Sequence, residues 1–152
     1  MAGFLEAFLV GASVGAVGVL AAVVLLARNT KGRSVARFVL PGRTANEVYQ
    51  IVSGYAASQR MRVTPTADGL LAQSGSEWIA GARILEVHAR DGAGGCEVLV
   101  EGYLRGFYPK EVHLDPSQFF GALPRRQTLR VAQGLLSVLG AGAVAFEHCR
   151  AG

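Results

Sequence analysis

The longest apolar run of the chain lies near its N-terminus. From Ala7 to Ala27 there is no charged side chain, and a helix of this length, at about 1.5 Å per residue, can cross a bilayer core. The pattern predicts a transmembrane helix over residues 1–27. The flank before the run has no Lys or Arg and the flank after it is basic, which favours a retained anchor over a cleaved secretion signal.

The same charge asymmetry predicts the orientation of the chain. Basic residues beside a span remain on the cytoplasmic side of the membrane. We therefore expect a single-pass membrane protein with its N-terminus outside and its C-terminal domain in the cytoplasm. The thiols of Cys96 and Cys149 should then be reduced.

Small residues recur along one face of the predicted span. Gly11 and Gly15 have GxxxG spacing, and Gly18 and Ala22 repeat the small-xxx-small spacing. Residues four apart share a helix face, and small side chains let another backbone approach closely. We expect these four residues to pack against the helix of another integral membrane protein, although Gly is also frequent in membrane helices in general.

Beyond the span, alternation of polar and apolar residues predicts strands. These cover residues 34–40, 61–66, 70–73, 82–90 and 96–104, with a short strand near 111–114. Within 82–90, Glu86 and His88 fall on one face and Leu85 and Val87 on the other.

Two stretches with helical spacing interrupt these strands. Thr44 and Glu47 form an S/T-x-x-E capping box, which predicts a helix from Thr44 to about Ser58. A second helix is expected to begin near Pro124 and to end at Gly140. Its polar face is predicted to carry Arg125, Arg126, Arg130, Gln133 and Ser137. The tail after Gly140 is either a short strand or loosely ordered.

The predicted order, β-α-β-β-β-β-α, is typical of an α+β domain with an antiparallel sheet and two helices. We divide the chain into a transmembrane helix at 1–27, a basic juxtamembrane tether at 28–33 and a cytoplasmic α+β domain at 34–152. In element order the domain resembles a shortened helix-grip fold. That resemblance implies a curved sheet around a long C-terminal helix and binding of a lipid or another apolar ligand.

The net charge of +4 is explained largely by residues close to the span. We expect these residues to contact anionic lipid headgroups, which attract basic side chains near the membrane surface. They are Arg28, Lys31, Arg33 and Arg37. No nucleic-acid recognition motif accompanies the excess charge, so we expect no nucleic-acid partner.

The chain shows no convincing catalytic constellation. Cys96 and Cys149 form no CxxC motif, and the three histidines have no helical metal-ligand spacing. We therefore expect no catalytic, cofactor or metal site. A thiol enzyme based on Cys96, or a histidine-dependent enzyme, is the least favoured alternative.

Aromatic residues concentrate in two regions outside the predicted helices, with Trp78 standing alone between glycines. They could contact a partner or a ligand, or they could cover the end of the sheet core. The residues are Trp78, Phe107, Tyr108, Phe119 and Phe120.

These features together predict a non-enzymatic accessory subunit of a larger membrane protein complex, of respiratory, photosynthetic or transport type. Its span and its cytoplasmic domain would both dock onto that complex. The alternative is a membrane-tethered domain that binds a lipid or another apolar ligand.

Overall fold

The computed structural model describes residues 19, 22, 30–75, 81–106, 110–118 and 122–150. The elements in chain order are β1 (Gly32–Leu40), α2 (Ala45–Ser58), β2 (Arg62–Pro65), β3 (Leu70–Ser74), β4 (Ala82–Gly92), β5 (Gly95–Arg105), β6 (Glu111–Val112), α3 (Ala122–Leu139) and β7 (Glu147–Arg150). The predicted small domain with an antiparallel sheet and two helices is confirmed. β1 begins inside the predicted tether, and the tail forms β7.

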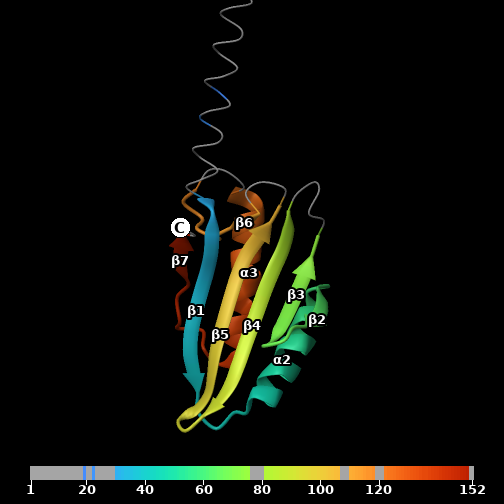
Figure 1. Ribbon diagram of the computed structural model, residues 1–152, viewed down its shortest axis with the longest axis vertical. Helices are drawn as coiled ribbons and strands as arrows, with labels where there is room; N and C mark the ends of the chain where they lie inside the picture. The colour runs from blue at the N-terminus through green and yellow to red at the C-terminus, as the bar shows by residue number, and fades with distance from the viewer. Residues whose placement is uncertain are drawn as a thin grey trace, which may run out of the picture.

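All strands belong to one antiparallel sheet with the order β2-β3-β4-β5-β1-β7 (Figure 1). β6 pairs with the end of β5, at Leu104 and Arg105, beyond the residues of β5 that pair with β1. The first strand of the domain therefore lies inside the sheet, between β5 and the C-terminal β7.

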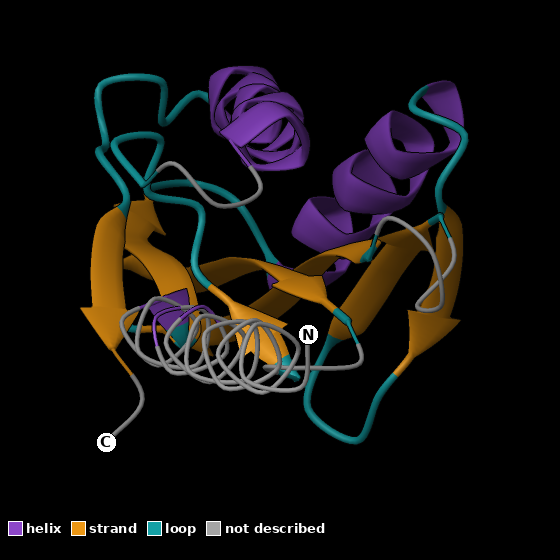
Figure 2. Cartoon of the chain, turned by 90° about the horizontal axis from the view of Figure 1, so that it is seen from above, coloured by secondary structure: helices purple, strands orange, loops and turns teal. Residues whose placement is uncertain are grey.

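Both helices cover the same face of the sheet (Figure 2). Because side chains alternate along a strand, every second residue of β4 and β5 points toward the helices, including Leu85, Val87, Val98 and Val100, and all four are buried. They pack against the apolar faces of α2 and α3 in one continuous core. Tyr55 joins the two helices by donating a hydrogen bond to the carbonyl of Val131 at 2.8 Å.

The ends of the helices follow the predicted chemistry. The hydroxyl of Thr44 accepts from the backbone of Glu47, and the carboxylate of Glu47 accepts from the backbone of Thr44, which completes the capping box. At the end of α3, Gly140 has φ +85 and the N–H of Ala141 reaches the carbonyl of Leu136 at 2.7 Å. This is the Schellman pattern, for which glycine suits the left-handed position.

One prediction about α3 is wrong. Arg125 was expected on the polar face, but its exposed fraction is 1%. Its Nη1 donates to the carbonyl of Asp115 at 3.3 Å, and its Nε has no hydrogen-bond partner. The segment that contains Asp115 covers the first turn of α3. A side chain that the helical period assigns to the solvent-exposed face is therefore buried there. Burial also lowers the pKa of the Arg125 guanidinium.

The predicted span at 1–27 lies outside the described residues except for Val19 and Ala22, which are helical and exposed. Among the helices that the structure does describe, none is both long and apolar enough to cross a bilayer. The packing role predicted for Gly11, Gly15 and Gly18 therefore concerns positions outside the described part, and it stays a prediction.

Candidate functional site

The face of the sheet opposite the helices carries most of the polar side chains that meet one another. We call it the helix-free face. The register places Glu86 of β4 directly opposite Glu101 of β5, so both point away from the helices. The face is formed by Ile84, Glu86, His88 and Arg90 of β4, Glu97, Leu99, Glu101, Tyr103 and Arg105 of β5, and Arg33, Val35, Arg37 and Val39 of β1.

Arg33 is the centre of an ion network on this face. Its Nε and Nη2 donate to the two carboxylate oxygens of Glu111 at 2.8 and 2.7 Å. Its Nη1 donates to one oxygen of Glu86 at 3.0 Å and to one oxygen of Glu101. Two carboxylates directly opposite on neighbouring strands repel each other. Arg33 neutralises that repulsion, and its hydrogen bonds hold the pKa of Glu111 below its usual value.

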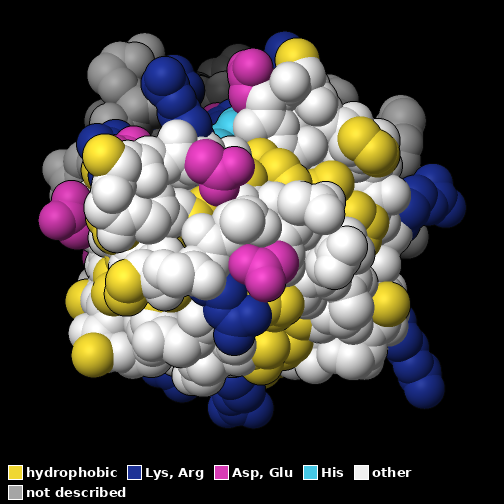
Figure 3. Space-filling view, turned by 90° about the horizontal axis from the view of Figure 1, so that it is seen from below, with side chains coloured by type: hydrophobic (Ala, Val, Ile, Leu, Met, Phe, Trp, Pro, Cys, Tyr) yellow, Lys and Arg dark blue, Asp and Glu magenta, His cyan; other side chains and the backbone are white. Residues whose placement is uncertain are grey.

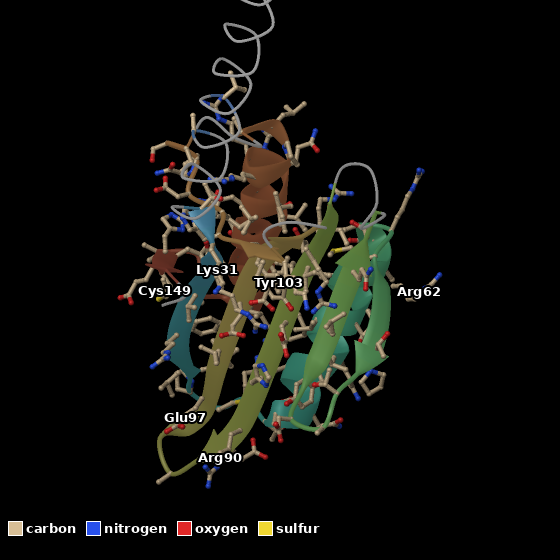
Figure 4. The ribbon with its side chains drawn as sticks, turned by 45° about the horizontal axis from the view of Figure 1, so that its top comes forward. Lys31, Arg62, Arg90, Glu97, Tyr103 and Cys149 are labelled. Atoms are coloured by element: carbon tan, nitrogen blue, oxygen red, sulfur yellow. The ribbon has the colours of Figure 1, made fainter. Side chains whose placement is uncertain are left out.

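Tyr103 lies on this face near the end of β5, at about the level of Lys31 (Figure 4), although it is fully buried. Its ring centre is 4.4 Å from the guanidinium carbon of Arg33 and 5.6 Å from that of Arg105, distances at which cations attract aromatic rings. Its hydroxyl accepts from Arg105 at 3.0 Å. Tyr103, Ile84 and Ala82 form a second, smaller apolar cluster on the helix-free side of the sheet. Burial raises the pKa of Tyr103.

His88 extends the network along β4. Its Nδ1 is 3.1 Å from the carbonyl oxygen of Asp68, and its Nε2 is 3.5 Å from Oε1 of Glu86. One ligand atom each from Glu86, His88 and Glu101 can be chosen so that all lie within 4.8 Å of one another. Among the described residues, this is the group that could hold a metal ion.

A broad hollow of about 700 Å³ opens on the helix-free face beside His88. Its walls include the basic Arg37 and Arg90, the acidic Asp68 and Glu97, and the apolar Val39 and Leu99. Arg90 and Glu97 mark the end near the β4–β5 turn (Figure 4). Seen from below, apolar, acidic and basic side chains lie close together at this end of the domain (Figure 3).

A hollow near the interface between the sheet and the helices is much smaller than the hollow on the helix-free face. The hollow lined by Gln59, Met61, Ser74, Arg83, Thr128 and Val131 has a volume of about 10 Å³, near the lower limit for a single water molecule. Among the described residues, apolar side chains of the sheet and of both helices pack into one continuous core.

The chain enters the domain through residues that are fixed in place. Thr30 is buried, and its carbonyl accepts from the backbone of His113 at 3.1 Å. Lys31 forms an isolated bridge with Val112. We call the end of the domain where Lys31 lies the upper end, as it is drawn in Figure 1 and labelled in Figure 4.

The predicted lipid contacts have different surroundings. Lys31 and Arg37 are exposed, whereas the guanidinium of Arg33 is engaged by three carboxylates within the domain. Arg28 lies outside the described residues. Contact with anionic lipid stays a prediction for this group.

The predicted aromatic contacts also fall outside the described part of the chain. Trp78 lies in 76–80, Phe107 and Tyr108 in 107–109, and Phe119 and Phe120 in 119–121. The elements that flank these segments meet at the upper end, where β3 and β5 finish and β4 and α3 start (Figure 1).

A second polar cluster ties β7 to the upper end. The buried hydroxyl of Ser34 accepts from the backbone of Leu114 at 2.7 Å and lies 2.7 Å from Nδ1 of His148. The rings of His148 and His113 are 5.8 Å apart. Because Ser34 is fully buried and its oxygen already bonds a backbone N–H, this serine–histidine pair connects chain segments and offers no accessible nucleophile.

The two cysteines differ in their surroundings, and neither forms a disulfide. Cys96 is buried in the core, and desolvation is the main cause of its raised pKa. Because the thiolate is the reactive form, Cys96 is a poor nucleophile. Cys149 on β7 is exposed.

Sequence reasoning missed the network around Arg33. Glu86 and His88 were placed on one strand face, and Glu101 belongs to the neighbouring strand of the predicted hairpin. Pairing of those two strands in register would have brought the three side chains together. The sequence did not indicate that Arg33 joins this network, because β1 pairs with β5 across a long separation in sequence.

We compared the chain with protein-family models, with curated proteins and with solved structures, and found no match in any of the three. The functional argument therefore depends on the residues and geometry above.

Proposed function

We propose that this protein is a single-pass, membrane-anchored accessory subunit whose cytoplasmic domain docks onto a larger membrane protein complex through its helix-free face. The observation that carries the proposal is a sheet face that neither of the described helices α2 and α3 covers, on which a fixed ion network lies beside a broad hollow with apolar and charged walls. Partner-binding surfaces commonly combine an apolar centre with polar groups in defined positions. Val39, on this face, is 52% exposed.

The way the chain enters the domain supports the same role. Thr30 and Lys31 are bound to the segment at 112–113, so little free chain separates the predicted span from β1. A short, clamped connection holds the domain close to the membrane surface in a restricted orientation. The helix-free face would then be presented sideways, toward a neighbour in the same membrane.

The packed core between the sheet and the helices favours this role over the binding of an apolar ligand. Ligand sites for small molecules usually have volumes of hundreds of Å³, and the hollow beside Met61 and Val131 is far smaller. The broad hollow on the outer face is open and is lined partly by charged residues, which suits a protein surface better than a lipid tail.

The docking proposal is tested by affinity purification of the full chain in mild detergent. Proteins that co-purify with the wild type should be lost with Val39→Lys. The new lysine stands opposite Glu97, so the substitution introduces no like-charge repulsion within the sheet. Val138 on α3 is 54% exposed, and Val138→Lys is the matched control that should keep the partners.

A second arm of the experiment addresses the predicted span. Gly15→Leu should weaken co-purification while leaving membrane insertion intact, because a bulky side chain blocks close helix approach. If the wild type extracts as a lone monomer, the subunit proposal fails. If Val39→Lys and Val138→Lys retain the same partners, the helix-free face is not the docking surface.

A further inference from the structure

We propose that Glu86, His88 and Glu101 form a binding site for a divalent transition-metal ion of the zinc type on the helix-free face. The three residues come from neighbouring positions of β4 and β5. Their potential ligand atoms lie within 4.8 Å of one another. The side chains of Glu86 and His88 are 17% and 28% exposed, so an ion can reach them from solvent.

The orientation of His88 points to a cation. A carbonyl oxygen can only accept a hydrogen bond, so the contact with Asp68 requires the proton on Nδ1. In the neutral imidazole, Nε2 then presents a lone pair toward Oε1 of Glu86 at 3.5 Å. Two acceptor atoms that face each other at this distance are placed to share a bound metal ion.

The distance between the ligand atoms of Glu86 and His88 fits a metal. At zinc–ligand bond lengths of about 2.0–2.1 Å in tetrahedral geometry, neighbouring ligand atoms lie roughly 3.4 Å apart. This is close to the observed 3.5 Å between Glu86 and His88. A histidine that ligates a metal through one ring nitrogen commonly donates its other N–H to a backbone carbonyl, and Asp68 supplies that acceptor.

Arg33 leaves room for such an ion. Its Nε and Nη2 are held by Glu111, while its Nη1 contacts only the Oε2 atoms of Glu86 and Glu101. Oε1 of Glu86 remains directed toward His88. Arg33 therefore holds the two carboxylates in position through their Oε2 atoms without contacting Oε1 of Glu86.

The charges around the site are balanced. The carboxylates of Glu86, Glu101 and Glu111 bond to or lie near Arg33, and Arg105 and Lys31 also act on Glu111. Counting formal charges on these six groups gives no net charge, so the proposal is carried by the arrangement of the ligand atoms beside His88. A nitrogen ligand favours zinc-type ions over Mg²⁺, which prefers oxygen alone.

The test is a titration of the full chain with Zn²⁺ in mild detergent, after removal of metal with a chelator. The wild type should bind one ion per chain, by calorimetry and by elemental analysis. His88→Ala and Glu101→Gln should each weaken binding by at least about 10-fold, and Mg²⁺ should not compete. Circular dichroism of the variants establishes that they are folded, and the near-isosteric Glu101→Gln serves if His88→Ala does not fold.

The matched control removes a possible competing site. His148 and Cys149 are adjacent and exposed, and a histidine–thiol pair can bind zinc by itself. The double substitution His148→Ala, Cys149→Ser should leave the stoichiometric site intact. The proposal is overturned if the wild type binds no stoichiometric zinc, or if the control abolishes binding while His88→Ala and Glu101→Gln do not. This outcome is independent of the docking experiments.

Discussion

Replacing Arg33 tests the ion network most directly. Arg33→Ala removes four charge-assisted hydrogen bonds and leaves Glu86 and Glu101 opposite each other without their shared cation. Loss of one partner from a fully buried ion pair costs about 3–5 kcal/mol, whereas an exposed pair contributes about 0–1 kcal/mol. The side chain of Arg33 is 31% exposed and those of Glu86 and Glu101 are 17% and 18% exposed, so the network lies between these limits.

We therefore expect Arg33→Ala to lower the free energy of unfolding by about 1–3 kcal/mol, which is the range between those two limits. For a domain of this size the melting temperature should fall by roughly 4–12 °C. Arg37 is the control, because it lies on the same strand and face and is exposed. Arg37→Ala should change the free energy of unfolding by less than about 0.5 kcal/mol.

The difference between wild type and Arg33→Ala should also depend on pH. Arg33 lowers the pKa of Glu111 in the folded state. That contribution to stability is complete above the unfolded pKa of about 4.3 and is lost as the pH falls through the lower folded pKa. The variant lacks this contribution at every pH. The stability difference should therefore narrow in acid.

The assay is thermal unfolding of the full chain in mild detergent, followed by far-UV circular dichroism at neutral pH and near pH 3. Equal melting temperatures for wild type and Arg33→Ala at neutral pH would show that the network does not stabilise the fold. A difference that stays constant or grows in acid would show that the lost energy is not electrostatic.

Three further predictions concern helix packing, an exposed helix position and the two cysteines. A Cβ on Gly134 would lie 2.3 Å from the hydroxyl of Tyr55, so Gly134→Ala should lower the free energy of unfolding by about 1–3 kcal/mol. Gly54→Ala in α2 meets no atom within 4 Å and should raise it by up to about 1 kcal/mol, with both measured by thermal unfolding. Cys149 should react rapidly with a thiol reagent and Cys96 only on unfolding, as followed by mass spectrometry; equal rates would contradict the burial of Cys96.

Much of the fold could be predicted because it depends on local patterns. The capping box at Thr44 and the glycine at 140 set helix ends through contacts within a few residues. Alternation in β4 and β5 correctly separated the core face from the face with Glu86 and His88. These features need only neighbouring positions along the chain, which the sequence displays directly.

The parts that escaped prediction depend on distant segments. Arg33 looked like a lipid contact because its sequence neighbours are basic, yet its three carboxylate partners lie at least 53 residues away. Arg125 looked solvent-facing by helical period, yet the segment before α3 covers it. Periodicity alone does not reveal which distant residues form ion pairs or which segments bury a helix position. Both determine which charged side chains form the site.

The position of β1 has a consequence for how the domain is made. Ser34 of β1 pairs with Gly102 of β5 and with His148 of β7. During synthesis, β1 therefore remains unpaired until these later strands have been made. Pairings of such large sequence separation form slowly, and an unpaired strand can associate with another chain meanwhile. Newly made molecules should therefore pass through an aggregation-prone interval, which chaperones that bind extended segments would shorten.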